Sequence, residues 1–287
     1  SVFLINVPIV VIALVLTVAL APENLPNLDK QWDVVSSFYA LVALSGLTMA
    51  IKQAAHSPAA TLAALAAAAV GAWLFVRRQH RLADPLLTFD IFRSRLFTGG
   101  VLAAAGGMFV LAGAELMTTQ KLQLVDALTP LTAGATVAVM ALSAIPASVL
   151  GGAYLHKIGF LPLIAGGFFG AVVGAVALAT GWTSIGMVLL GLSAGSVMSV
   201  SSIAIIGSAP MHRSGMAAGV EEVSYELGTL ITVALTGSLL QAALDRGVEY
   251  TDAYNGVIGV LAAGAACFAV ATWWCFRDNP KSGGVDA

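Results

Sequence analysis

Long apolar runs separated by short polar breaks extend along the whole chain. A helix that crosses a bilayer needs about 20 predominantly apolar residues. The runs of about this length lie at residues 2–21, 36–55, 60–77, 96–117, 131–153, 160–180, 184–207, 214–243 and 254–276. Alanine and glycine are abundant inside them, which favours close contact between helices. The pattern therefore predicts an all-α polytopic membrane protein with nine transmembrane helices.

Composition agrees with this class and excludes several others. Of the 287 residues only 10% are charged, whereas a soluble domain carries about 25%. The net charge of −2 gives no basic footprint for nucleic acid. Phosphate-binding glycine loops and the HExxH pattern are missing from the sequence, and its four histidines are scattered. We therefore expect no enzyme activity, no cofactor and no metal.

The distribution of lysine and arginine predicts the orientation. Nine spans place 10 of the 13 basic residues in loops on one side; the exceptions are Lys52, Lys121 and Arg246. The positive-inside rule makes the richer side cytoplasmic. We expect a multi-pass plasma-membrane protein with Ser1 outside and Ala287 inside. An outside amino end without a signal sequence is natural if an odd number of spans precedes the chain.

The span at 214–243 contains three acids. Glu222 and Glu226 are four residues apart and share one helix face, flanked by Tyr225. Glu221 is rotated from Glu222 by about 100°. Counting from Ser214 at about 1.5 Å per residue, Glu222 is about 12 Å and Glu226 about 18 Å into the helix, so Glu226 lies near the middle of the bilayer. A charge there costs about 2.5–3.5 kcal/mol, so we expect both acids to face the bundle interior or water.

Acids in such a position can exchange a proton for a cation. Shielding from water favours the protonated acid, whereas a bound cation favours the carboxylate. We predict that Glu222 and Glu226, with Tyr225 and Glu221, bind protons or a cationic substrate; fixing helix packing through hydrogen bonds is the alternative role. Glu115, near the outer end of its span, is either solvated at the interface or an outward-facing contact for a proton or cation.

Small residues and proline mark candidate positions for packing or gating. Pro146 interrupts its span and is followed by Gly152, which favours either a bend that moves during transport or tight packing. Gly215 and Gly219 form a small-xxx-small pair at the start of the acidic span. Close approach to a neighbouring helix is the simpler role for this pair, and gating is the alternative.

Short signatures follow one another along the chain at helix starts and in loops. They are Phe3–Ile9, Trp32–Asp33, Asp84–Leu87, Phe92–Arg95, Gln120–Gln123, Leu128–Leu131 and Arg213–Gly228. In this order they resemble the fourteen-span drug:proton antiporters of the major facilitator superfamily. The stretch that Arg213 opens is most similar to the quaternary-ammonium and methyl-viologen resistance branch, and we group Arg213 with the gating or packing candidates.

The resemblance implies a division of the chain and a function. Residues 1–95 would hold the sixth span, two inserted spans and a basic cytoplasmic loop. Residues 96–276 would form the C-terminal six-helix transporter bundle, and residues 277–287 a cytoplasmic tail. The expected function is proton-coupled export of lipophilic cations such as quaternary ammonium compounds or dyes. The expected partners are the lipid bilayer, protons and these cations.

Other interpretations stay open at this stage. The family's N-terminal bundle would lie before Ser1, so the chain would transport only with that bundle, supplied by the same or a separate chain. The same architecture could instead export another amphipathic substrate, such as an antibiotic, a peptide or a siderophore. The chain could also be a non-transporting membrane half-protein that pairs with another chain.

Overall fold

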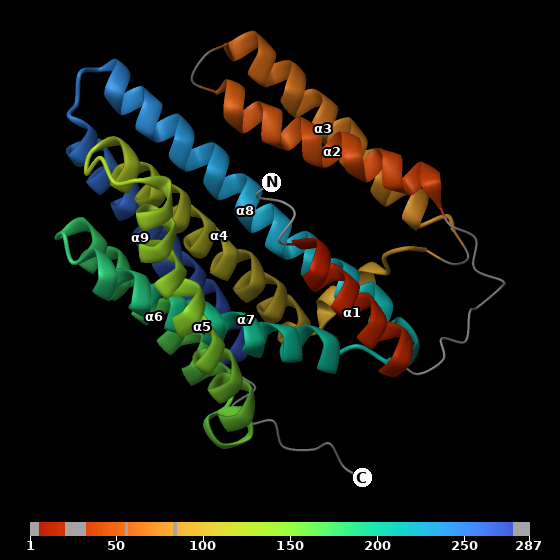
Figure 1. The fold of residues 1–287 in the computed structure, drawn as a ribbon. Coiled ribbons are helices and arrows are strands. Elements are labelled where there is room, and N and C mark those ends of the chain that lie inside the picture. Colours follow the sequence, from red (N-terminus) through yellow and green to blue (C-terminus); the bar gives the residue numbers. More distant parts are fainter. Residues whose placement is uncertain (1–5, 21–32, 55–56, 83–84, 278–287) are drawn as a thin grey trace. The chain divides into compact units, whose positions relative to one another are not determined.

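The protein is helical throughout the part that the structure describes. The computed structural model describes residues 6–20, 33–54, 57–82 and 85–277, and every regular element in these ranges is a helix (Figure 1). Eight of the helices are long and apolar enough to cross a membrane. Helix α1 (Asn6–Leu20) is apolar but shorter, and both ends of the span predicted at 2–21 lie outside the described residues. The predicted all-α polytopic class is confirmed.

The remaining helices follow the predicted spans closely. They are α2 (Val34–Gln53), α3 (Pro58–Gln79), α4 (Arg95–Leu124), α5 (Pro130–Ile158), α6 (Phe160–Ala179), α7 (Thr183–Gly207), α8 (Ser214–Asp245) and α9 (Tyr250–Phe276), with short 3₁₀ turns η2 (Phe89–Arg93) and η3 (Met211–Arg213). The span predicted to end at residue 117 continues as helix α4 to Leu124. Apolar runs mark the part of a helix suited to lipid, whereas the helix itself continues into polar residues.

Helix starts use side-chain caps that the sequence supplies at polar breaks. The Ser57 hydroxyl accepts a hydrogen bond from the Ala60 N–H (3.3 Å) before α3. Ser94 and Thr129 cap α4 and α5 in the same way. These bonds satisfy donors that have no partner within the helix.

The chain divides into two compact units between Val34 and Val35. The first contains α1, and the second contains the other helices. Several sequence landmarks, including Phe3–Ile5, Trp32 and Asp84, lie outside the described residues, as does the predicted tail beyond Arg277.

Helices α2 and α3 pack against each other through glycine. A Cβ atom at Gly46 would lie 2.7 Å from the Ala68 nitrogen, and one at Gly71 would lie 2.7 Å from the Ala43 nitrogen. Each glycine therefore lets the backbone of the partner helix approach more closely than any side chain would allow.

Helices α4 and α7 are the most enclosed of the remaining six. Helix α7 packs against α5 and α6, while α4 packs against α7, α8 and α9. A Cβ atom at Gly191 would overlap the Met140 carbonyl oxygen, and one at Gly195 would overlap that of Ala144. The two glycines are four residues apart on α7, so this helix presents a small-residue seam to the backbone of α5.

Pro146 and Gly152 both lie within α5. The helix continues through Pro146, whose ring is exposed, so the proline does not end the helix. A Cβ atom at Gly152 would lie 3.3 Å from the Ser199 hydroxyl oxygen on α7. Of the two roles expected for Gly152, the structure therefore supports packing against a neighbouring helix.

Candidate functional site

Helix α8 turns its acidic residues to two different sides. It begins at Ser214, as predicted, and its 32 residues extend over about 48 Å. Gly215, Gly219, Glu222 and Glu226 are all exposed. Their spacing of four, three and four residues aligns them along one side of the helix, here named the acidic face. The predicted common face of the two glutamates is therefore confirmed.

The opposite side of α8 packs into the bundle. Its buried residues include Ala217, Glu221, Ser224 and Gly228. A Cβ atom at Gly228 would overlap the carbonyl oxygen of Ala105 in α4. Because this contact fixes the rotation of α8, the acidic face points away from α4. Of the two surroundings expected for these acids, the bundle interior or water, the interior is not supplied by the helices that the structure describes.

Glu221 is the acid that the bundle encloses. Only 8% of the surface of Glu221 is exposed. The Tyr225 hydroxyl donates a hydrogen bond to Glu221 Oε1 (2.9 Å) and lies 3.5 Å from the Met198 carbonyl oxygen on α7. The predicted rotation of Glu221 away from Glu222 is confirmed. Tyr225, which the sequence placed beside the acidic face, is instead the partner of the buried acid.

Gly215 and Gly219 do not form the close helix contact that the sequence favoured. Among the residues that the structure describes, no atom outside the local helix lies within 4 Å of a Cβ built at either position. Both glycines instead extend the acidic face toward the start of α8. Their small size leaves the backbone beside Glu222 open.

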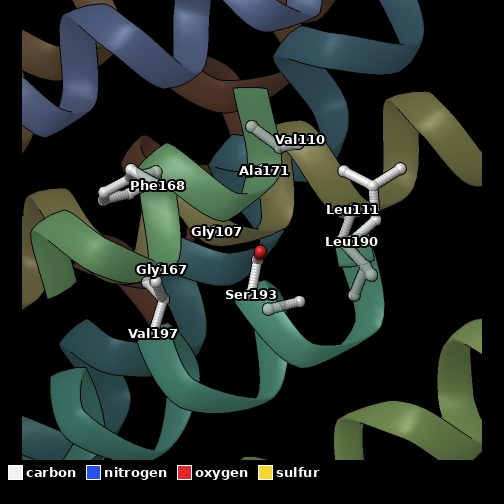
Figure 2. A pocket seen from close by; sticks show the side chains of 10 residues that line it. Gly107, Val110, Leu111, Gly167, Phe168, Ala171, Leu190, Ser193 and Val197 are labelled. Atoms are coloured by element: carbon white, nitrogen blue, oxygen red, sulfur yellow. The ribbon is translucent and has the colours of Figure 1, made fainter. Parts of the chain in front are cut away.

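A small cavity lies among α4, α6 and α7. Figure 2 shows Phe168 and Gly167 of α6 opposite Ser193 and Val197 of α7, with Gly107 of α4 behind them. Its volume is about 10 Å³, roughly the space that one water molecule needs. The Ser193 hydroxyl already donates a hydrogen bond to the Leu189 carbonyl (2.7 Å). This cavity is too small for an organic cation.

Arg213 is held by a residue far away in the sequence. Its Nη1 atom lies 2.9 Å from Asp90 Oδ2 in η2. The hydrogen bond from Arg213 holds the pKa of Asp90 below its usual value. One turn further along, the Thr88 N–H and hydroxyl contact the Met216 sulfur at 3.3 and 3.4 Å. The loop before α4 therefore anchors the start of the acidic helix.

An apolar cluster supports the same junction. Ile91, Phe97, Ile205 and Ala217 are buried together and come from η2, α4, α7 and α8. The ion pair and this cluster therefore both stabilise the junction where α7 ends and α8 begins.

Glu115 lies on the exposed surface of α4, apart from these contacts. The helix continues for nine residues beyond it, about 13 Å. Near that end the Thr118 and Tyr254 hydroxyls are 3.1 Å apart, and the Lys121 ammonium lies 4.9 Å from the Tyr254 ring centre. Glu115 is therefore less close to the helix end than the apolar run indicated.

Comparison with known proteins relates the chain to drug exporters. No protein-family model matches it. It is 34% identical to the multidrug efflux pump LfrA of Mycolicibacterium smegmatis, over 98% of this chain and 59% of LfrA. It is 28% identical to the methyl viologen resistance protein SmvA of Salmonella typhimurium, over 87% of this chain and 52% of SmvA.

A third relative is the drug efflux pump JefA of Mycobacterium tuberculosis, 29% identical over 88% of this chain and 52% of JefA. The chain thus spans between half and three fifths of the length of these curated relatives. The chain is a multi-pass, all-α membrane protein that is similar, over most of its own length, to bacterial multidrug efflux pumps.

Proposed function

We propose that this chain forms the C-terminal portion of a proton-coupled multidrug antiporter of the major facilitator superfamily that exports lipophilic cations. Its similarity to named efflux pumps supports the export function. Its similarity to a methyl viologen resistance protein supports a cationic substrate. In this proposal residues 96–276 form the C-terminal bundle and residues 1–95 precede it.

The acidic face of α8 is the observation on which the proposal depends. Glu222 and Glu226 are exposed about 12 and 18 Å from the start of an apolar helix about 48 Å long. A charged side chain that faces lipid at this depth costs about 3 kcal/mol. Two such residues are tolerated only if the face lines a water-filled path or a second bundle covers it.

Exchange on this face follows from simple electrostatics. Once a second bundle covers this face and shields it from water, an acid there favours its protonated form while no cation is near. An arriving organic cation favours the carboxylates of Glu222 and Glu226 and expels the protons. The enclosed Glu221 is out of reach of a bulky cation. Its partner within α8, Tyr225, also contacts the Met198 carbonyl oxygen of α7.

Movement would come from rocking this bundle against an N-terminal bundle around a site near the midplane. Gly215 and Gly219 would let that second bundle approach the acidic face. The excess of basic residues supports a topology in which the ends of α3, α5, α7 and α9 lie at the cytoplasmic surface. The plasma membrane is then the site of export.

The test is efflux of a fluorescent lipophilic cation from cells that express the complete gene. We expect the double variant Glu222→Gln plus Glu226→Gln to lose export and its dependence on external pH. The matched control is Glu249→Gln, an exposed acid outside the acidic face. Intact, pH-dependent export by the double variant would refute the proposal.

A further inference from the structure

A second and larger cavity lies outside the acidic helix. It has a volume of about 440 Å³ and is lined by the end of α3 and by the loop that leads to α4. Its polar lining comes from Gln79, His80, Thr88, Asp90 and Arg93. The volume falls within the range of about 300–1,000 Å³ that small-ligand sites occupy.

Two contacts between arginine and tryptophan mark the depth of this cavity. The Arg77 guanidinium lies 5.1 Å from the Trp73 ring centre, and that of Arg95 lies 5.6 Å from the ring centre of Trp274. Both tryptophans are exposed. Tryptophan and arginine at helix ends occupy the level of the lipid headgroups. The lining begins two residues after Arg77 and ends two residues before Arg95, so the cavity lies at this level.

The wall of the cavity is built around a buried amide. Gln79 is 3% exposed. Its side-chain nitrogen donates to the Ser36 hydroxyl (2.7 Å), and its side-chain oxygen accepts from the Leu87 N–H (3.0 Å). The His80 ring lies 5.3 Å from that of Phe89. These contacts hold the loop against the end of α3 and so define the wall of the cavity.

Arg93 supplies a positive charge to the cavity lining. Asp90, the acid in the lining, is already paired with Arg213 at 2.9 Å. Arg93 is exposed, and no carboxylate among the described residues forms an ion pair with it. His80 contributes an imidazole to the same lining. A guanidinium that no described carboxylate pairs is suited to phosphate, which it can contact through two hydrogen bonds.

We propose that this cavity binds the phosphodiester headgroup of an anionic phospholipid, with Arg93 and His80 as the residues that contact the phosphate. The tryptophans on either side and the headgroup depth favour lipid over free phosphate as the source of the anion. The bound lipid would also brace the loop that holds Arg213 at the start of α8. The proposal is independent of the substrate that the protein transports.

Native mass spectrometry of the full protein, purified in detergent, tests this site with phosphatidylglycerol as the probe. Replacing Arg93 removes a charge-assisted hydrogen bond, so we expect Arg93→Gln to weaken phosphatidylglycerol binding about tenfold. We expect His80→Gln to weaken it less, and neither variant to change the weak binding of phosphatidylcholine. The matched control is Arg81→Gln, which removes the same charge from the same loop outside the cavity lining.

Two results would overturn the proposal. Equal losses in Arg93→Gln and Arg81→Gln would mean that lipid responds to the charge of the loop as a whole. Displacement of phosphatidylglycerol by millimolar inorganic phosphate would mean that the site takes the free anion. Thermal unfolding of each variant is measured in parallel. If Arg93→Gln does not fold, the comparison of His80→Gln with Arg81→Gln decides between the same outcomes.

Discussion

Single positions without room for a side chain hold the bundle together. Gly191 and Gly195 face the backbone of α5, and Gly228 faces that of α4. At each of these glycines an added Cβ atom would overlap a carbonyl oxygen of the partner helix. Interhelical packing in membranes depends on such contacts, because lipid tails are as apolar as the side chains they replace.

We expect Gly195→Ala to lower the free energy of unfolding by about 1–3 kcal/mol, since the added methyl must push α5 away. Gly166→Ala on α6 is the control, because a Cβ there meets no described atom within 4 Å, and it should change stability by less than about 0.5 kcal/mol. Unfolding of the purified protein in mixed detergent measures both. Equal effects would show that the α5–α7 seam is looser than the structure indicates.

The buried acid offers a second test at this scale. Tyr225→Phe removes the hydrogen bond to Glu221 at 2.9 Å and should lower stability by about 1–3 kcal/mol. Glu222→Gln on the acidic face should leave stability nearly unchanged. The same unfolding measurement compares the two variants. A larger loss for Glu222→Gln would contradict the assignment of Glu221 as the enclosed acid.

The sequence predicted which acids share a face, but not which face points inward. Spacing along a helix fixes the angle between Glu221 and Glu222. The rotation of the whole helix depends on a tertiary contact, here Gly228 against Ala105. In a membrane protein the lipid-facing and core-facing sides are both apolar, so the hydrophobic pattern does not separate them.

At the scale of elements, a short loop connects two distant parts of the second unit. Gln79 at the end of α3 accepts a hydrogen bond from the Leu87 N–H. Three residues later, Asp90 forms the ion pair with Arg213. The sequence identified the loop as basic and Arg213 as a candidate for gating or packing. It held no signal for a pair 123 residues apart, because such pairs depend on how helices pack.

The ion pair has a definite pH dependence. The hydrogen bond from Arg213 lowers the pKa of Asp90 below 3.8, the usual value for aspartate. The ion pair therefore stabilises the folded protein above about pH 4, and this stabilisation is lost as pH falls through the folded-state pKa. Hydrogen exchange of the amides at 211–217 should stay constant from pH 8 to 5, after correction for intrinsic rates, and rise at lower pH. Asp90→Asn should raise it at every pH.

Glu249→Gln is the matched control for this measurement, since it removes an acid from another loop. Unchanged exchange in Asp90→Asn would show that Thr88, Met216 and the apolar cluster hold the junction without the ion pair.

At the scale of the whole molecule, the apolar pattern predicted the helices because each span must satisfy its own backbone hydrogen bonds in lipid. Orientation and division into bundles stay predictions. The described structure does add that aromatic rings pair with Arg77, Arg95, Lys157 and Arg277 at helix ends on the basic side. Such pairs are typical of a membrane interface.

Labelling of single cysteines tests the orientation. In a variant without Cys267 and Cys275, a cysteine at His80 should react with a membrane-impermeant maleimide only from the cytoplasm. A cysteine in place of Asp126, just after the C-terminal end of α4, should react only from outside. Labelling of both positions from the same side would contradict the predicted topology.

If an organic cation and protons compete for Glu222 and Glu226, binding of the cation must release protons, and this release can be measured. Methyl viologen is added to the complete purified transporter in weakly buffered detergent, and a pH-sensitive dye follows the protons. We expect proton release by the wild-type protein and its loss in the double variant Glu222→Gln plus Glu226→Gln. Cation binding without proton release, or equal release by the double variant, would contradict it.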